Sequence, residues 1–340
     1  MTPPTMRLGG RSVGGVNPTY VIAEIGINYE GDADICARMV EACAAAGVDA
    51  VKLQTADPDE HYAPDTESHT TYRRAMLPRE ATAEIFALGR RCGIDVFTTC
   101  GDPPTLAYIE ALDPVAHKIS SGMVNHVSMI RRFAATGRPI ILSTGMSELP
   151  QIDRAVAAAR SGITTDLAVL HCVSLYPAPE NLLNLRAIRS LAERYNLPTG
   201  FSDHTQSLDV PVFAVAAGAS LIEKHISLDP SRSGFDHRVS VTPDSLGEIV
   251  RRIRALEAML GDGDKVLSAP EREMARNMRR AVVARRHVVR GAVLTDADLQ
   301  VARIAPGKAG LGAEFFETTI GRRINCDLEP YSPILDDMFD

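Results

Sequence analysis

Four features are missing from this sequence, and each absence excludes a class of protein. No apolar run reaches the roughly 18 residues that a membrane-spanning helix needs. The first residues, MTPPTMRLGGRSVGG, lack the continuous apolar core of a signal peptide. There is no long basic run, and the net charge of −7 argues against a nucleic-acid partner. The six cysteines show no CxxC spacing, which excludes a zinc knuckle and a disulfide framework. We therefore expect a cytoplasmic protein without membrane or nucleic-acid partners, in which most cysteines are buried as small apolar residues.

Eight short apolar stretches are present instead, and each ends in polar or ionisable side chains. Near-continuous apolar runs of this length are typical of strands that are buried on both faces of a parallel sheet. The stretches cover residues 20–26, 49–54, 94–99, 115–121, 139–144, 167–174, 199–204 and 220–225.

Amphipathic segments between these stretches, such as residues 32–47, 79–93 and 150–162, predict helices that end at glycine. The repeated alternation of strand and helix predicts an α/β fold, a TIM (β/α)8 barrel. In such a barrel the carboxyl ends of all eight strands meet at one mouth, where the active sites of this fold lie.

The pattern changes near the C-terminus and predicts a second domain. A last amphipathic helix ends in a Gly/Asp turn, and short strands begin near Ala281. We expect a catalytic barrel over residues 1–265, a polar linker over 266–280, and a small β-rich domain over 281–340. Because about 60 residues form only a marginal core, this domain should dock on its own barrel or on that of a partner.

Two histidines, His204 and His225, end neighbouring predicted strands. Either one alone is best explained as a hydrogen-bonded core histidine. Together, with Glu24, Asp203 and Glu223 near the same mouth, they favour a shared divalent ion. Carboxylate, water and imidazole ligands suit Mn²⁺ or Mg²⁺ better than a thiophilic metal.

Two lysines, Lys52 and Lys118, end other strands among hydroxyl groups. A lysine that points into a barrel is costly unless a negative charge meets it. A guest that carries both phosphate and carboxylate would supply that charge, although Glu24 or Glu223 could also pair with these lysines as structural support. The hydroxyls that would shape this pocket belong to Thr99, Ser121, Ser143, Ser174 and Ser202.

The segment SGFDHRVS follows the eighth strand and contains Asp236 and His237. An acidic residue in a loop over the mouth can bind sugar hydroxyls or transfer a proton. It could equally cap the following helix, and its spacing does not decide between these roles.

Nine strings occur in order along the chain and, together, resemble the sialic acid synthase family, which makes neuraminic, legionaminic and pseudaminic acids. They are AEIGINYEGD, VKLQT, FTTCGD, KISSGM, ILSTGMSE, HCVSLYPAP, GFSDHT, IEKHISLD and GFDHRVS. The stretch ARRHVVRGAVLTDADLQVARIAPG resembles the family's antifreeze-like (SAF) domain. The resemblance implies a transferase that condenses phosphoenolpyruvate with an N-acyl hexosamine aldehyde, forming a nonulosonic acid and phosphate.

The resemblance also implies a role for each matching residue. His204 and His225 would bind the Mn²⁺ or Mg²⁺ ion, and Glu24 would move the proton of the attacking water. Phosphoenolpyruvate would contact Lys52, Thr99, Lys118, Ser121, Ser143, Ser174 and Ser202. The acceptor would contact Gln54, Met123, Tyr176, Asp236 and Arg303. Arg303 would act from the SAF domain on a neighbouring subunit, which implies a domain-swapped homodimer.

The sequence departs from the family pattern on the acceptor side. Met123 stands where the string KIxSGE usually has its acid, and a thioether neither accepts a strong hydrogen bond nor carries a proton. The usual NHNG has become Asn28, Tyr29, Glu30 and Gly31, and the segment from Lys52 to Thr99 is short.

These departures leave alternatives open. The aldehyde could lie outside the N-acyl hexosamines, with Met123 packed on an apolar part of it. The barrel could bind phosphoenolpyruvate or a sugar without turnover. A third alternative is a phosphoenolpyruvate aldolase of the deoxy-heptulosonate or deoxy-octulosonate type, which has the same predicted barrel but lacks the SAF domain.

Overall fold

The computed structural model describes residues 4–162 and 166–340. The chain forms two compact units, Met1–Asp262 and Gly263–Asp340. The net charge of −7 belongs to the first unit, because the second has as many lysines and arginines as aspartates and glutamates.

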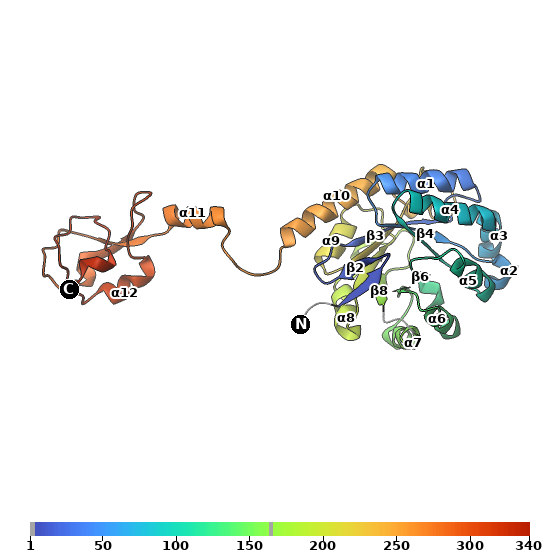
Figure 1. Cartoon of the computed structure of the whole chain (residues 1–340), viewed down its shortest axis with the longest axis horizontal. Helices are drawn as coiled ribbons and strands as arrows, with labels where there is room; N and C mark the ends of the chain where they lie inside the picture. The colour runs from blue at the N-terminus through green and yellow to red at the C-terminus, as the bar shows by residue number, and fades with distance from the viewer. Residues whose placement is uncertain (1–3, 163–165) are drawn as a thin grey trace. The chain divides into compact units, whose positions relative to one another are not determined.

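The first unit is the predicted barrel, with eight parallel strands closed in the order β10-β3-β4-β5-β6-β7-β8-β9 (Figure 1). Every predicted apolar stretch contains one of these strands. Their bounds are β3 (Tyr20–Gly26), β4 (Ala50–Gln54), β5 (Asp95–Thr99), β6 (His117–Ile119), β7 (Ile140–Ser143), β8 (Leu167–Cys172), β9 (Thr199–Asp203) and β10 (Leu221–His225).

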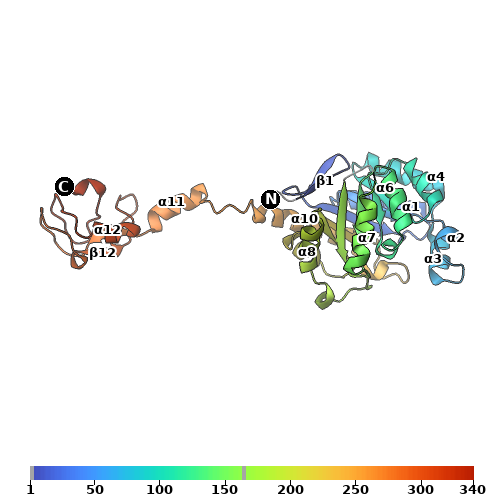
Figure 2. The same cartoon turned by 90° about the horizontal axis from the view of Figure 1, so that it is seen from below.

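Helices surround the strands (Figures 1 and 2). They are α1 (Ala33–Ala45), α2 (Pro58–His61), α3 (Glu67–Ala75), α4 (Arg79–Arg91), α5 (Pro103–Glu110), α6 (Val127–Ala135), α7 (Leu149–Ala159), α8 (Arg186–Tyr195), α9 (Val210–Ala216) and α10 (Pro243–Leu260). The residue before several of these helices accepts a backbone N–H through its side chain, as Asp32 does from Ile35 and Thr242 from Ser245. Such caps explain why these helices begin where they do.

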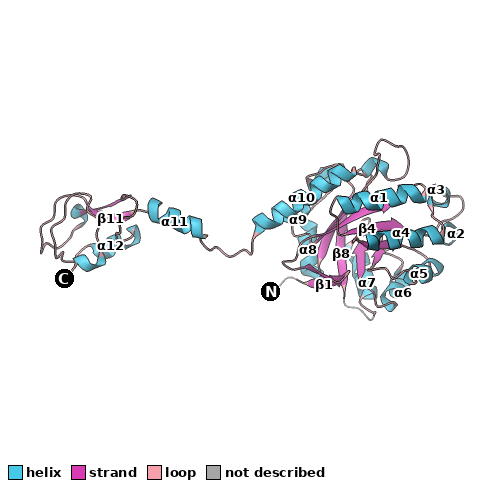
Figure 3. Cartoon of the chain, turned by 45° about the horizontal axis from the view of Figure 1, so that its top comes forward, coloured by secondary structure: helices cyan, strands magenta, loops and turns pink. Residues whose placement is uncertain are grey.

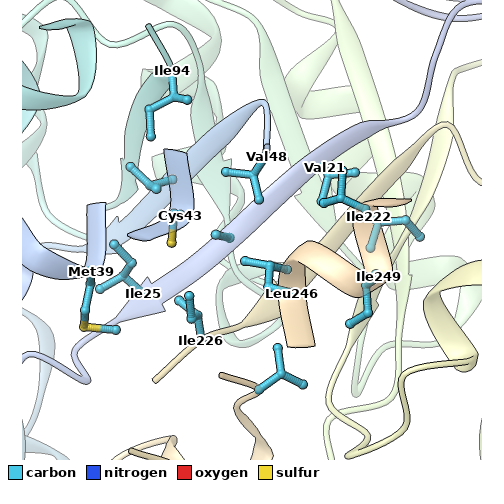
Figure 4. Close-up of a cluster of buried hydrophobic side chains, with 14 of the residues drawn as sticks. Val21, Ile25, Met39, Cys43, Val48, Ile94, Ile222, Ile226, Leu246 and Ile249 are labelled. Carbon is cyan, nitrogen blue, oxygen red and sulfur yellow. The ribbon is translucent and has the colours of Figure 1, made fainter. Parts of the chain in front are cut away.

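Apolar side chains on the outer face of the strands bind the helices to the barrel. Val21 and Ile25 of β3 belong to one buried cluster with Met39 of α1 and Leu246 and Ile249 of α10 (Figure 4). Their spacing of four along β3 keeps both on one face, so the other face, which includes Ile22 and Glu24, points into the barrel.

A short hairpin precedes the barrel and was not anticipated from the sequence. It consists of β1 (Thr5–Leu8) and β2 (Arg11–Gly14), paired in antiparallel fashion. Met6, Leu8 and Val13 pack in one buried cluster with Tyr20 and Leu221, which begin two barrel strands. The hairpin therefore covers the end of the barrel opposite the mouth.

The second unit contains little regular structure (Figure 3). Its elements are α11 (Ala269–Met278), β11 (Ala281–Ala284), β12 (Leu299–Ala302) and α12 (Phe316–Thr319). Strands β11 and β12 pair in antiparallel fashion, and isolated bridges such as Val288 with Leu328 extend the pairing. A small cluster that includes Val282, Leu299 and Ile334 forms its core. Helix α11, in the segment predicted as a polar linker, buries none of its residues.

Across the described residues, no helix is both long and apolar enough to cross a membrane. Cys36, Cys43, Cys100 and Cys172 are buried, and Cys92 and Cys326 are partly exposed. All six thiols are free.

Candidate active site

A cavity of about 300 Å³ lies at the carboxyl ends of the barrel strands. Of the barrel residues to which the family resemblance assigns a role, all but Met123 line it. These are Glu24, Lys52, Gln54, Thr99, Lys118, Ser121, Ser143, Ser174, Tyr176, Ser202, His204, His225 and Asp236. Residues scattered over more than 200 positions of sequence therefore meet at one mouth, as the barrel topology predicts.

The register of the parallel strands explains the closest contacts. Glu24 is the register partner of both Lys52 and His225, and Ser202 is the register partner of Glu223. Partners in register lie at the same height on neighbouring strands. Their inward side chains therefore meet across the strand boundary.

Two lysines and two glutamates form a buried ionic network at the base of the cavity. Lys52 Nζ lies 2.9 Å from Glu24 Oε2 and 3.6 Å from Glu223 Oε2, and Lys118 Nζ lies 3.4 Å from Glu223 Oε1. All four side chains are at most 4% exposed. The four charges cancel, which is the condition under which such groups can be buried together.

The two glutamates of this network differ in their proton affinity. Burial raises the pKa of Glu24 to about 7, with Lys52 opposing the shift and Glu223 reinforcing it. Burial would also raise the pKa of Glu223, but Lys118, Lys52 and the Ser202 hydroxyl outweigh it and lower the pKa to about 2. Glu223 therefore stays ionised, while Glu24 can exchange a proton near neutral pH.

Hydroxyl groups next to the lysines form a cradle with unused hydrogen-bonding capacity. Ser143 Oγ is buried and has no hydrogen-bond partner among the described residues. Ser121 Oγ accepts the Gly145 N–H at 3.0 Å. A Cβ atom at Gly145 would lie 2.2 Å from Ser174 Oγ, so only glycine keeps this space open. A buried donor without a partner points to a ligand in the cradle.

The two imidazoles lie side by side at the mouth, with their ring centroids 5.3 Å apart. His204 Nδ1 lies 3.0 Å from the Val173 carbonyl oxygen, to which it donates in the neutral ring, so the lone pair is on Nε2. His225 Nδ1 is buried without a hydrogen-bond partner among the described residues. Burial lowers the pKa of His225 well below its usual value, and His204 and Lys52 reinforce that shift. Burial acts to lower the pKa of His204 as well, but the Cys172 thiol and the Val173 carbonyl outweigh it and raise that pKa. Burial therefore favours the neutral ring for His225 only.

The carboxylates beside these imidazoles are arranged differently from the prediction. Asp203, the last residue of β9, points out of the cavity because its chain neighbours Ser202 and His204 line it. It forms a 2.6 Å ion pair with Lys224, and both side chains are fully buried. Asp203 is thus a structural partner of Lys224. Asp236 does reach the cavity, with Oδ2 3.8 Å from His225 Nδ1.

Met123 is the barrel residue with an implied role in acceptor binding that the structure does not bring to the cavity. It ends a short 3-10 helix, Ser121–Met123, that follows β6. Its side chain is 4% exposed and packs in the same buried cluster as Ile119, Ile130 and Phe133. Met123 is therefore a core residue, and the idea that it packs on an apolar part of the acceptor loses its basis. The acid that usually ends the string KIxSGE is therefore missing, and the side chain that replaces it does not reach the cavity.

Arg303 belongs to the second unit, directly after β12, and its side chain is exposed. It forms no hydrogen bond or ion pair with another described residue. That Arg303 acts on the barrel of a neighbouring subunit stays a prediction.

Residues that the sequence reasoning missed also line the cavity, among them His61, Tyr62, Tyr72 and Met146. Tyr62 and Tyr72 come from the segment with α2 and α3, and their ring centroids lie 4.8 Å apart. The Tyr72 hydroxyl donates to the Gln54 side-chain oxygen, while the Gln54 amide donates to Glu24 at 2.8 Å. No spacing rule predicts these contacts, because α2 and α3 fold back over the mouth from a loop.

An eight-stranded barrel whose mouth gathers lysines, carboxylates, hydroxyls and imidazoles defines an enzyme of the TIM-barrel class. Residues 39–265 match the NeuB family, and residues 279–340 match the SAF domain. The chain belongs to the NeuB family, which confirms the resemblance seen in the motifs.

Individual relatives extend the similarity over nearly the whole chain. A protein of Methanocaldococcus jannaschii without an assigned function is 35% identical over 95% of both chains. The N,N'-diacetyllegionaminic acid synthase of Legionella pneumophila is 31% identical over 96% of this chain and 97% of its own length. The N-acetylneuraminic acid synthetase of Leptospira borgpetersenii, solved in complex with citrate, is 30% identical, with a TM-score of 0.77 over 80% of this chain and 95% of its own. Several relatives of this chain are named synthases, and this chain is a transferase of the same broad class.

Proposed function

We propose that this enzyme condenses phosphoenolpyruvate with an open-chain N-acyl hexosamine aldehyde, forming a nonulosonic acid and inorganic phosphate. The observation that carries the proposal is the serine and lysine cradle beside two adjacent imidazoles. Its similarity to a legionaminic acid synthase and to a sialic acid synthetase supports the class of product.

The cradle fits the two acidic groups of phosphoenolpyruvate. Lys118 is 2% exposed, and among the described residues its ammonium group meets only Glu223, at 3.4 Å. An ammonium carries three donors, so Lys118 has hydrogen bonds to give to an incoming anion. Ser143, Ser121 and Ser174 add hydroxyl donors at the same place. In this proposal these groups bind the phosphate before the reaction and after its release.

The residues present fit a hard divalent ion, Mn²⁺ or Mg²⁺. His204 and His225 would be the protein ligands, because His225 Nδ1 is buried without a hydrogen-bond partner among the described residues and His204 uses Nδ1 for the Val173 carbonyl, which leaves Nε2 for a ligand. The described residues contain no group of three or more His, Cys, Asp or Glu that could hold a metal. Substrate and water would complete the coordination, as Mg²⁺ usually allows. When bound, such an ion supplies Lewis-acid chemistry to the aldehyde oxygen.

The chain's own groups then account for the remaining steps. Carbon 3 of phosphoenolpyruvate forms a bond to the aldehyde carbon, the C=O π pair moves to the aldehyde oxygen, and positive character develops at carbon 2. Water adds to carbon 2 and gives one proton to Glu24, which passes it to the former aldehyde oxygen. The tetrahedral intermediate then loses phosphate by cleavage of the C–O bond, and its hydroxyl proton leaves with the phosphate as the ketone forms. Glu24 suits this role because its pKa of about 7 makes it a base that is also readily reprotonated.

The proposal is tested by phosphate release from phosphoenolpyruvate with Mn²⁺ across a panel of aldehydes. The panel contains N-acetylmannosamine, bacillosamine- and altrosamine-derived N-acyl sugars, and simple pentoses and hexoses, each with and without chelator. We expect chelator-sensitive release with an N-acyl sugar. Release with simple sugars alone would contradict the acceptor class, and silence with tight phosphoenolpyruvate binding would indicate a binding protein.

Glu24 should give the reaction an acidic limb in its pH profile. A carboxyl with a pKa near 7 accepts a proton only when ionised, so the rate should fall as pH decreases through about 7. Glu24→Gln should lower kcat by about 10²–10⁴-fold and abolish this limb. Glu80→Gln, at an exposed carboxylate in the first turn of α4, is the control and should leave the profile unchanged. An acidic limb that survives in Glu24→Gln would assign the proton to another group.

We further propose that two chains form a domain-swapped homodimer in which Arg303 serves the acceptor site of the partner. Mixing two inactive variants, His204→Ala and Arg303→Ala, tests this directly. If Arg303 acts in trans, mixed dimers contain one intact site and should recover about a quarter of the wild-type activity, from random pairing. No recovery in dimers shown to exchange subunits would mean that Arg303 acts on its own barrel, and an active Arg303→Ala variant would mean that Arg303 serves neither site.

A further inference from the structure

A buried hydrogen-bond chain lies directly behind Asp236 and is not used by the proposed reaction. His237 is 1% exposed, and both of its ring nitrogens have partners. Nδ1 lies 2.7 Å from Ser227 Oγ, and Nε2 lies 3.0 Å from Glu30 Oε1.

The direction of these bonds follows from their partners. Ser227 Oγ already accepts the Asp229 N–H at 3.0 Å, so its hydroxyl can donate to His237 Nδ1. Nε2–H then donates to Glu30, which accepts only. Every member is satisfied in this arrangement, and loss of the Glu30 carboxylate would leave a buried N–H without a partner.

The turn after β3 that contains Glu30 also contains Asn28, which holds the backbone of Asp236. Asn28 Oδ1 accepts the Asp236 N–H at 3.0 Å, while the Asn28 amide donates to the Ile226 carbonyl and to Ser240 Oγ, each at 2.9 Å. Ser240 Oγ in turn donates to the Asp236 carbonyl at 2.7 Å. Both the N–H and the carbonyl of Asp236 are thus held, by Asn28, which follows β3, and Ser240, which follows β10.

Backbone conformation shows that both segments are held against local preference. Glu30 and Phe235 adopt left-handed conformations, with φ of 55° and 48°. Side chains other than glycine adopt this region rarely and need surrounding contacts to hold them there. Glu30 also forms a 2.8 Å ion pair with Arg232, which belongs to the same loop as Phe235.

We propose that Glu30 and His237 act as positioning residues that hold Asp236 at the rim of the cavity and thereby set the affinity for the acceptor sugar. This inference rests on the proposed function, in which Asp236 contacts the acceptor. It gives a role to one of the chain's departures, since Glu30 stands in the turn where the family motif usually reads NHNG. The carboxylate at this position links the turn to His237 and Arg232.

The test compares Glu30→Ala and Glu30→Gln with Glu67→Ala. Glu67 is a carboxylate that lines the same surface cavity as Glu30 but makes none of these bonds, so it is a matched control. Two properties are measured: hydrogen exchange over residues 228–238, and KM and kcat for both substrates. Hydrogen exchange needs no turnover and reports directly whether the hydrogen bonds that hold Asp236 are intact.

For Glu30→Ala we expect weaker exchange protection of the Asp236 amide and an acceptor KM about tenfold higher, the size of one lost hydrogen bond. The kcat and the phosphoenolpyruvate KM should stay within about threefold. Glu30→Gln keeps an acceptor for His237 and should restore most of the protection and the affinity. Glu67→Ala should match the wild type in both measurements.

Other outcomes separate the possible failures. A higher acceptor KM with unchanged protection would overturn the positioning role, because Glu30 would then contact the sugar directly. Reduced protection with unchanged KM would also overturn the proposal. If the wild-type protein turns over no N-acyl sugar, the proposed function fails. Unchanged exchange protection in Glu30→Ala would overturn the positioning role independently of that result.

Discussion

Replacing His204 by alanine is expected to abolish metal-dependent phosphate release, with a loss of at least about 10³-fold in kcat. Because His204 and His225 are the two imidazoles that line the cavity mouth among the described residues, besides His61, and are the proposed ligands, removal of His204 leaves the ion one proposed imidazole ligand. The His204 ring also stacks on Tyr176, with centroids 4.2 Å apart, so the substitution removes support for the acceptor side. Phosphate release and Mn²⁺ binding by calorimetry should be lost together.

The control for this experiment is His287→Ala. His287 lies in the second unit, and its side chain is half-exposed. We expect wild-type activity and metal affinity for this variant. Loss of activity in His204→Ala with unchanged Mn²⁺ affinity would refute the role of His204 as a metal ligand, although His204 would still be needed for activity.

Replacing Lys118 by methionine is expected to raise the KM for phosphoenolpyruvate by about 10- to 150-fold. Lys118 is a buried cation beside Ser121 and the ionised Glu223, and a charge-assisted hydrogen bond to an anion is worth about 1.5–3 kcal/mol. Its loss also leaves Glu223 with less compensating charge, so the pKa of Glu223 should rise and the cavity should become less receptive to a dianion.

Lys265→Met is the matched control, because the Lys265 side chain is 86% exposed. Calorimetric titration with phosphoenolpyruvate should show weak binding for Lys118→Met and unchanged binding for Lys265→Met. The thermal unfolding of both variants should be measured as well, to show whether each one is folded. If Lys118→Met folds normally and binds phosphoenolpyruvate as tightly as the wild type, the anion would have to lie elsewhere in the cavity.

Much of the candidate site could be predicted because barrel strands obey a two-residue period. Side chains two apart point to the same face, so Glu223 with His225, and Ser202 with His204, must share the cavity if one of each pair does. The same period excludes Asp203, which lies between two inward residues, and a stricter use of it would have removed Asp203 from the metal candidates. The lysines follow the same rule: of the three on barrel strands, Lys52 and Lys118 line the cavity, while Lys224 lies between the inward residues Glu223 and His225 and pairs with Asp203.

Residues outside the strands could not be placed in this way. Met123 follows β6 in a 3-10 turn, where no two-residue period applies, and its side chain turns into the core. Tyr62 and Tyr72 reach the mouth because a loop with two short helices folds over it, and long-range packing determines that path. The contact between Glu30 and His237 joins residues 207 positions apart, and neither one has a local pattern that points to the other.

The sequence by itself determined the order of strands and helices, the end of the barrel where chemistry takes place, and the family, because each depends on local periodicity or on motifs that occur in order. Tertiary structure alone decided which carboxylates face the ligand, how burial separates the pKa values of Glu24 and Glu223, and how Asp236 is held. These properties depend on distances between strands and on exclusion of water, and both arise only when the barrel closes and brings the charges together in a low-dielectric interior.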